Sequence, residues 1–364
     1  NESLIIKLKE LGYRSVYINE PGTESVLPED VLAEATRQET LVDISSYYNL
    51  LKDRVHQYMK KKRMNPVDLA ELDCIPLLLP SSQVITESVD EIYKDLFLTG
   101  SLPKYMQVSG VGGSESLINH LLNTAVLSML IGDSFNYSEG EQKALGKGAM
   151  LHDIGKVAFE NLYQKTYWEL DYEEKEQIRK HPEIGKNILE RSRVITEVEK
   201  QIVLQHHERQ DGTGYPSELQ GDNEKPYRKE HIKPRHIFRF AEIISVANVF
   251  DNLLSGHLLA KHLTPKEALK EILAMSGSVL NSSIVESFFN LVELYPVGEN
   301  VEIMEHPDPG LQGSYGVVKA AESGEMKEVE VVIVKDKKGK KVTPFETSVK
   351  LAASNQKLHL ISGL

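Results

Sequence analysis

Cysteine, positive charge and long apolar runs are all scarce in this sequence of 364 residues. The single cysteine, Cys74, rules out a disulfide within the chain and favours a reducing, cytoplasmic compartment. Acidic residues outnumber basic ones by 54 to 42, and the net charge of −12 argues against binding to a DNA or RNA polymer. The longest apolar runs, near Ile75–Leu79 and Ala125–Ile131, are too short to span a membrane.

The remaining composition is that of a folded protein with room for more than one domain. Hydrophobic residues make up 40% of the chain and charged residues 26%, which excludes a disordered polymer. An acidic protein that handles a phosphate substrate needs local positive charge, and bound metal ions supply it most simply. We predict a multidomain, mainly α protein with an all-α helical bundle, an α/β N-terminal regulatory module and a small C-terminal β-barrel-like module.

Residues 1–110 are predicted to form a regulatory, sensory or dimerisation module, through which a homodimer could assemble. Apolar residues at helical spacing indicate a helix over residues 3–11, and Ser15–Ile18 has the pattern of a strand. A longer helical pattern runs from about Pro28 to Met64. No set of catalytic residues is evident in this part of the chain.

Residues 111–295 begin with a linker and are then strongly helical, with residues suited to helix caps before several apolar patterns. The expected helices cover about residues 116–135, 138–151, 174–192, 196–207, 234–255, 264–276 and 281–294. Residues 296–364 alternate instead between apolar and polar side chains, which predicts a small β domain. Its expected strands are Val301–Met304, Tyr315–Lys319, Glu328–Lys335 and Lys357–Ile361.

Two adjacent histidines, His206 and His207, close a predicted helix and precede a turn rich in glycine that ends at Tyr215 and Pro216. Neighbouring helical residues diverge by about 100°, so the pair addresses two points and suits two metal ions better than one. Upstream, Leu151-His152-Asp153-Ile154-Gly155-Lys156 offers a nitrogen ligand beside a carboxylate that can bridge two ions.

His120 lies inside an amphipathic helical pattern, and His181 directly precedes Pro182. Either histidine alone is more simply explained as a structural residue. Their conjunction with His152, Asp153, His206 and His207 in one helical domain predicts a metal centre, because several helix ends there carry histidine followed by glycine or proline. With no cysteine in the set, its nitrogen and oxygen donors suit Fe, Mn or Zn.

The order of these motifs resembles the HD phosphohydrolase superfamily, over about residues 116–292. The stretch His206-His207-Glu208-Arg209-Gln210-Asp211-Gly212-Thr213-Gly214-Tyr215-Pro216, with His-Asp-Ile-Gly-Lys upstream, is similar to its HD-GYP branch. That resemblance implies an HD-type bundle and a bacterial phosphodiesterase that hydrolyses the second messenger cyclic di-GMP to linear pGpG, GMP or both. It also implies two divalent ions, with Fe as the first choice and Mn as the alternative.

The resemblance implies a role for each matching residue. Asp153 would bridge the ions, with His120 and His152 on one ion and the remaining histidines, His181, His206 and His207, on the other. A hydroxide bridging the metals would attack phosphorus while the ions hold the phosphate oxygens. Lys156 would bind the same phosphate, and Tyr215 would stack on or hydrogen-bond to the nucleotide. Glu208 and Arg209 are expected to brace the loop.

The sequence departs from the family pattern at several places. Asn248 stands where the family usually has an aspartate ligand, and an amide oxygen can bind a metal but brings no charge. After it, only Lys261 keeps the positive charge that arginines often supply for the substrate phosphate. Gln210 replaces the usual tryptophan. The long stretch 217–235 carries basic residues including Arg235, which suggests a lid or a basic substrate wall, although a solvated loop is the commoner explanation.

In members of the resembled family that hold three ions, a glutamate precedes the first histidine by about one helical turn, so the resemblance implies an acidic ligand at that distance before His120 for a third ion. Glu115 lies five residues before His120, which is about 140° around a continuous helix, so Glu115 can serve only if the helix begins after Ser116. We therefore expect two ions. Two other functions stay open: a catalytically weakened cyclic dinucleotide-binding or scaffold protein, and an HD-type phosphohydrolase or di-iron oxygenase of another kind. The Gly-Tyr-Pro turn argues against the second.

Overall fold

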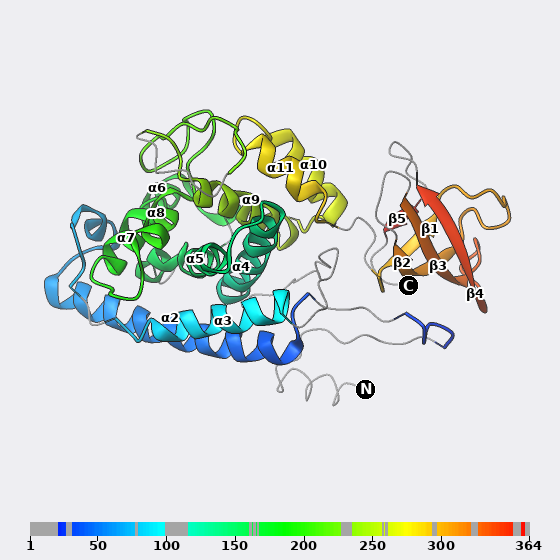
Figure 1. Ribbon diagram of the computed structural model, residues 1–364, viewed down its shortest axis with the longest axis horizontal. Coiled ribbons are helices and arrows are strands. Elements are labelled where there is room, and N and C mark those ends of the chain that lie inside the picture. The colour runs from blue at the N-terminus through cyan, green and yellow to red at the C-terminus, as the bar shows by residue number, and fades with distance from the viewer. Residues whose placement is uncertain are drawn as a thin grey trace. The chain divides into compact units, whose positions relative to one another are not determined.

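The computed structural model describes residues 21–26, 31–76, 79–98, 116–159, 162, 165, 167–226, 235–256, 258, 261–292, 297–321, 327–351 and 358–360. These residues fall into two compact units (Figure 1). The helical unit takes the described residues between Leu32 and Val292, and the β unit takes residues 21–26 and 31 with those from 297 onward. Each unit is described here by itself.

The helical unit contains α-helices of 7 to 29 residues together with short 3-10 helices. In chain order these are α2 (Glu34–Lys62), η1 (Pro66–Glu71), α3 (Gln83–Phe97), α4 (Ser116–Ser134), α5 (Glu139–Leu151), η2 (Ile154–Ala158), η3 (Tyr167–Glu169), α6 (Tyr172–Ile178), α7 (His181–Leu189), α8 (Glu197–Gln205), α9 (Arg239–Leu254), α10 (Pro265–Met275) and α11 (Ser282–Phe289). Helix α4 is buried between α5 and α9, and α8 packs against both α5 and α7. Leu121, Leu122 and Phe250 are fully buried in this core, where the Phe250 and Phe288 rings meet edge to face at 4.8 Å.

Polar caps start the helices where the sequence predicts them. The backbone amides of Ser138 and Thr196 donate hydrogen bonds to the carboxylates of Glu141 and Glu199 at 2.7 and 2.8 Å, which completes a capping box at the start of α5 and of α8. Asn281 caps α11 by accepting hydrogen bonds from the Ser283 and Ile284 amides. These caps fix where α5 and α8 begin. The opposite ends of the two helices are followed by His152 and His206.

One predicted helix, 174–192, is wrong as a single element, because it is divided into α6 and α7. Pro182 is the physical reason. A proline lacks the backbone N–H, and its ring clashes with the carbonyl four residues earlier, which here belongs to Ile178. Helix α6 therefore ends at Ile178, and α7 begins at His181 with proline in its first turn.

The N-terminal residues contribute α2 and α3, which pack against each other and against the helical core through α4, α5 and η2. The long predicted helix from Pro28 to Met64 is confirmed as α2. The expected helix over 3–11 and the strand Ser15–Ile18 lie outside the described residues. A separate regulatory module over 1–110 stays a prediction. No helix among the described residues is long and apolar enough to cross a membrane.

The β unit is an antiparallel sheet with strand order β4-β3-β2-β1-β5. Its strands are β1 (Asn300–Ile303), β2 (Tyr315–Ala321), β3 (Lys327–Lys335), β4 (Lys341–Leu351) and β5 (Leu358–Leu360). One face buries an apolar cluster around Val301, Val331 and Val349, and the other packs Val26 against Val332 and Val334. The barrel-like form stays a prediction.

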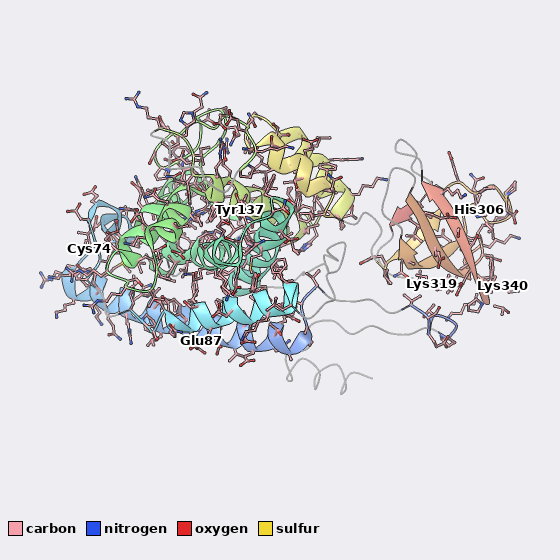
Figure 2. All side chains as sticks on the ribbon, viewed as in Figure 1. Cys74, Glu87, Tyr137, His306, Lys319 and Lys340 are labelled. Carbon is pink, nitrogen blue, oxygen red and sulfur yellow. The ribbon has the colours of Figure 1, made fainter. Side chains whose placement is uncertain are left out.

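Strand β4 was not predicted, because Pro344 and several charged residues interrupt its alternation. In the sheet β4 pairs with β3 alone, and a proline is tolerated on such an edge strand because its missing N–H can face away from the neighbour. Lys319 on β2 bridges Glu330 and Glu346 on these strands at 3.5 and 2.8 Å (Figure 2). The lone cysteine, Cys74, lies partly buried in the helical unit.

Candidate metal centre

Three of the predicted histidines share one structural device at the end of a helix. His152 follows α5, His206 follows α8, and His181 lies three residues after the last residue of α6. The last carbonyls of a helix have no partner within it, and each imidazole Nδ1–H donates to the carbonyl three residues before it. These bonds measure 2.6 Å to Ala149, 2.7 Å to Ile178 and 2.9 Å to Val203. Each ring is thereby held with Nε2 free of hydrogen in its neutral form.

His120 is oriented in the same way by a side chain from another helix. Its Nδ1–H donates to Oδ2 of Asp251 at 2.6 Å, and Oδ1 of Asp251 accepts a hydrogen bond from Asn123 Nδ2 at 2.8 Å. His120 and Asn123 belong to α4 and Asp251 to α9, so the packing of these two helices brings the pair together. Sequence reasoning missed this role of Asp251, although it lies three residues after Asn248 on the same helix.

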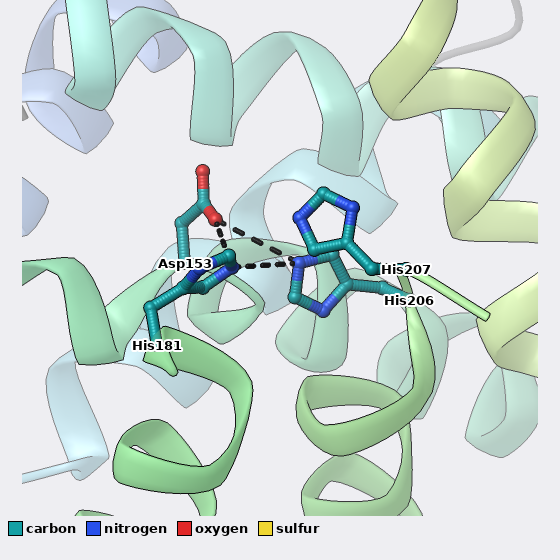
Figure 3. Close-up of side chains that lie close together, drawn as sticks. All are labelled: Asp153, His181, His206 and His207. Carbon is teal, nitrogen blue, oxygen red and sulfur yellow. Dashed lines mark hydrogen bonds and ion pairs between the residues drawn. The ribbon is translucent and has the colours of Figure 1, made fainter. Parts of the chain in front are cut away.

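The four Nε2 atoms meet in two pairs around Asp153. The Nε2 atoms of His120 and His152 lie 3.3 Å apart, and those of His181 and His206 lie 3.2 Å apart. Asp153 Oδ2 is 3.4 Å from His152 Nε2. Asp153 Oδ1 is 3.1 Å from His181 Nε2 and 3.7 Å from His206 Nε2 (Figure 3). Each carboxylate oxygen therefore faces one pair of imidazoles.

This geometry fits two cations. Two nitrogens bound to one ion at about 2.1 Å with an angle of about 100° lie about 3.2 Å apart, as both pairs do. Without a cation, two lone pairs would face each other in each pair, and Asp153 Oδ1 is buried without a hydrogen-bond partner. The ligand atoms form two groups that could each hold an ion, Asp153 with His181, His206 and His207, and Asp153 again with His120 and His152.

The protonation states also suit a metal. Burial lowers the pKa of His206 to about 3 and lowers the pKa values of His181 and His207 as well, so these imidazoles are neutral at physiological pH. Burial alone raises the pKa of Asp153, but the charges of Lys156 and His152 outweigh it and hold that pKa well below its usual range. His181, His206 and His207 thus offer neutral nitrogen donors, and Asp153 offers an ionised carboxylate, the forms that bind a metal ion.

Lys156 lies in η2, and its Nζ contacts Asp153 Oδ2 at 2.6 Å. Gly155 allows this turn to lie against the start of α7, since a Cβ there would meet the His181 carbonyl oxygen at 1.9 Å and the Gly185 nitrogen at 2.7 Å. The glycine between Asp153 and Lys156 is therefore a requirement of the close approach that brings His181 to Asp153.

Helix α2 holds the same turn from the outside. The buried Tyr48 hydroxyl donates to the Met150 carbonyl at 2.7 Å, and His56 Nε2 bonds to the Val157 carbonyl at 3.0 Å. Met150 and Val157 lie on either side of the segment from His152 to Lys156. These contacts span about a hundred residues of sequence, and no pattern in α2 predicted them.

Tyr215 lies against the histidine cluster. Its ring stacks on His207 with centroids 4.7 Å apart and an interplanar angle of 18°, and the Arg179 guanidinium lies over it at 4.6 Å. Glu208 braces the loop as predicted, because its carboxylate accepts hydrogen bonds from the Ser217 and Leu219 amides at 2.7 and 2.9 Å. Arg179 was not singled out from the sequence.

Gln210, where the family usually has tryptophan, is buried behind the loop. Its Nε2 donates to Glu242 Oε1 at 2.6 Å, and its Oε1 accepts from the Asn223 amide at 3.0 Å. Glu242 also pairs with Arg239 at 3.0 Å. Gln210 therefore fastens the loop to α9 through polar contacts.

The remaining predicted site residues are less closely joined to the cluster. Asn248 is buried on α9, and its Oδ1 accepts a hydrogen bond from Asn252 Nδ2 at 2.5 Å. It lies between Ser245 and Asp251 on this helix, and the Ser245 hydroxyl donates to the His206 carbonyl at 2.6 Å. Lys261 and Arg235 are exposed, and no described contact joins either to the histidines. Glu115 and residues 227–234 of the predicted basic loop lie outside the described residues.

Comparison with known proteins agrees with this geometry. Residues 114–284 match the HD domain family. The chain is 30% identical over 177 residues to a cyclic di-GMP phosphodiesterase response regulator of Xanthomonas campestris, covering 48% of this chain and 43% of that protein. It is 29% identical over 212 residues to a Thermotoga maritima protein named cyclic di-GMP phosphodiesterase, covering 58% and 52%. A Vibrio cholerae protein named 3'3'-cGAMP-specific phosphodiesterase 2 is 30% identical over 168 residues, covering 46% and 30%.

Among solved structures, an HDG"Y"P protein from Bdellovibrio bacteriovorus aligns with a TM-score of 0.47 and 15% identity, covering 79% of this chain and 77% of that one. Residues 114–284 of the chain carry an HD domain, and the predicted resemblance to the HD-GYP branch agrees with relatives that are named cyclic di-GMP phosphodiesterases. The matched region spans about half or less of the length of these curated relatives.

Proposed function

We propose that this protein is a metal-dependent phosphodiesterase that hydrolyses cyclic di-GMP to linear pGpG, to GMP or to both. The observation that carries the proposal is the meeting of two ligand groups at one buried carboxylate, Asp153, beside the Tyr215 turn. The names of the relatives support the substrate, and they favour hydrolysis over a role as a non-catalytic binding or scaffold protein.

The proposed ligands follow the two groups. His120 and His152 would hold one ion, and His181, His206 and His207 would hold the other, with Asp153 as the ligand that the two groups share. Iron is our first choice and manganese the alternative, because the donors are nitrogen and oxygen without thiolate. When bound, two such ions supply Lewis acidity toward phosphate oxygens and an activated water. Asn248 adds a neutral oxygen donor at most, and Glu115 is the candidate for a third ion.

The protein's own groups prepare this chemistry. Four imidazoles are fixed through Nδ1 by carbonyls or by Asp251, which leaves every Nε2 aimed at the site and raises its basicity. The Lys156 ammonium forms an ion pair with Asp153. When substrate binds, we propose that it also donates a hydrogen bond to a non-bridging phosphate oxygen. Tyr215 is proposed to contact the nucleotide, and the exposed Lys261 and Arg235 to attract its phosphates. A cytoplasmic location and a homodimer also stay proposals.

The test is turnover by the chain loaded with Fe²⁺ or Mn²⁺ and offered cyclic di-GMP or 3'3'-cGAMP, with products separated by chromatography. We expect linear dinucleotide or GMP from cyclic di-GMP. Turnover by His181→Ala should fall by about 100-fold or more, because loss of a partner behind a metal ligand already costs about 10- to 100-fold. The matched control is His306→Ala in the β unit, which should keep full activity. Two bound ions with no turnover of either dinucleotide would contradict the proposal and favour the binding protein.

A further inference from the structure

Beside the candidate metal centre, two tyrosine rings are each covered by a cation, one from helix α6 and one from the residue that caps the end of this helix. Lys175 Nζ lies 5.0 Å from the centre of the Tyr167 ring, and the Arg179 guanidinium carbon lies 4.6 Å from the centre of the Tyr215 ring. Lys175 and Arg179 are one turn apart, with the Arg179 amide donating to the Lys175 carbonyl at 3.1 Å. Residues so spaced project from one face of a helix, so both rings lie along that face. We call Tyr167, Lys175, Arg179 and Tyr215 the ledge.

The ledge begins at the metal ligands and reaches solvent. Its inner end is Tyr215, whose ring stacks on His207 of the group that contains Asp153. Its outer end is Tyr167, which is 43% exposed and is followed by Trp168, the single tryptophan of the chain, 51% exposed.

Packing within the fold does not account for the ledge. Tyr167 lies on a short 3-10 turn in which no residue is buried. Among the described ion pairs of Arg179, the contact to Glu176 is 3.6 Å long, and both side chains are about half exposed, so it contributes little. A protein with a net charge of −12 thus presents two cations and two flat rings together, next to a site suited to phosphate.

We propose that the ledge binds a purine base of the nucleotide substrate, with Tyr167 as a stacking surface and the planar guanidinium of Arg179 as a second one. Aromatic rings accept any base face, and arginine adds a cation–π contribution. The phosphate at the metal ions and the base on the ledge would then be held by adjoining surfaces. This inference rests on the proposed function, since it assigns the place of a base whose phosphate occupies the metal centre.

The test compares two ligands that share a phosphate and differ by the base. Affinities of GMP and of ribose 5-phosphate are measured by calorimetry on the metal-loaded full chain, with the unfolding temperature as a check on folding. Tyr167→Ala should weaken GMP about 5- to 20-fold, the range expected for loss of one stacking partner, and leave ribose 5-phosphate within about twofold. Tyr167→Phe keeps the ring and should restore GMP affinity.

Arg179→Lys keeps the charge but loses the planar group, and it should weaken GMP selectively. Arg193→Met is the matched control for loss of an exposed arginine, because Arg193 lies between the ends of α7 and α8 that are farthest from His181 and His206. Equal losses for both ligands, or no loss for GMP in Tyr167→Ala, would overturn the ledge. If the chain binds GMP on the ledge but never hydrolyses cyclic di-GMP, the proposed function fails while the ledge stands.

Discussion

Replacement of Asp251 by asparagine tests how the His120 imidazole is held, because it changes the hydrogen-bond partner of His120 and removes none of the proposed metal ligands. Asp251 is buried, accepts the Nδ1–H of His120 at 2.6 Å and accepts Asn123 Nδ2 at 2.8 Å. In the variant the amide oxygen can still face His120, and the new amide nitrogen can face Asn123 if that side chain turns its amide over. The shape is kept, whereas the negative charge behind the imidazole is lost.

The magnitudes follow from these contacts. Loss of a hydrogen bond to a charged group costs about 1.5–3 kcal/mol, and part of that cost is recovered by the neutral bond, so we expect the free energy of unfolding to fall by about 1–2 kcal/mol. Loss of the partner behind a metal-binding histidine typically weakens metal affinity about 10- to 100-fold. The ion bound by His120 and His152 should suffer this loss, and the ion of the His181 group should not.

Titration of metal-free protein with Mn²⁺, followed by calorimetry, measures both affinities in the wild type and in Asp251→Asn. Asp336→Asn in the exposed hairpin between β3 and β4 is the matched control, and it should change neither affinity. Unchanged affinity at both sites in Asp251→Asn would refute the role of Asp251 as a positioning residue. Equal weakening of both sites would show that the variant disturbs the whole centre rather than one imidazole.

Further outcomes follow from the same contacts. Gly155→Ala should lower the free energy of unfolding by about 1–3 kcal/mol, measured in urea, because its Cβ would meet the His181 carbonyl; wild-type stability would contradict the close approach. The free energy of unfolding of the metal-free chain should fall as the pH drops from about 6.5 toward 3. The reason is that His206 binds a proton in the unfolded state over this range, whereas burial keeps it neutral in the folded state, where its pKa is about 3. A urea midpoint that does not change between pH 7 and pH 4 would contradict this. Asn248→Asp adds a charge beside the ligands and should raise metal affinity and turnover; if turnover does not rise, Asn248 is not the weak point.

The local parts of this account could be predicted from sequence, and the long-range parts could not. Helix caps and apolar periodicity located most of the helices of the core, and the histidines at helix ends indicated a metal centre. The break between α6 and α7 was missed, although Pro182 is a local signal, because the helical pattern continues on both sides of it. Strand β4 was missed because Pro344 is acceptable only on an edge, and edge position is set by the partners of the strand.

The missed site residues have a common reason. Asp251, Tyr48 and Arg179 act through partners that are far away in sequence, respectively His120, Met150 and Tyr215. A carboxylate, a phenol and a guanidinium on helices carry no local sign of such partners. Only the packing of α9 on α4, of α2 on the turn after α5, and of the Tyr215 loop on α6 brings these groups to the centre.

The central claim is that two ions lie on either side of Asp153. Anomalous diffraction at the iron edge, from crystals grown with Fe²⁺ in the absence of oxygen, tests it most directly. We predict two peaks, one within bonding distance of His120, His152 and Asp153, and one within bonding distance of Asp153 and the group His181, His206 and His207. A single peak, or peaks that do not share Asp153, would contradict the account.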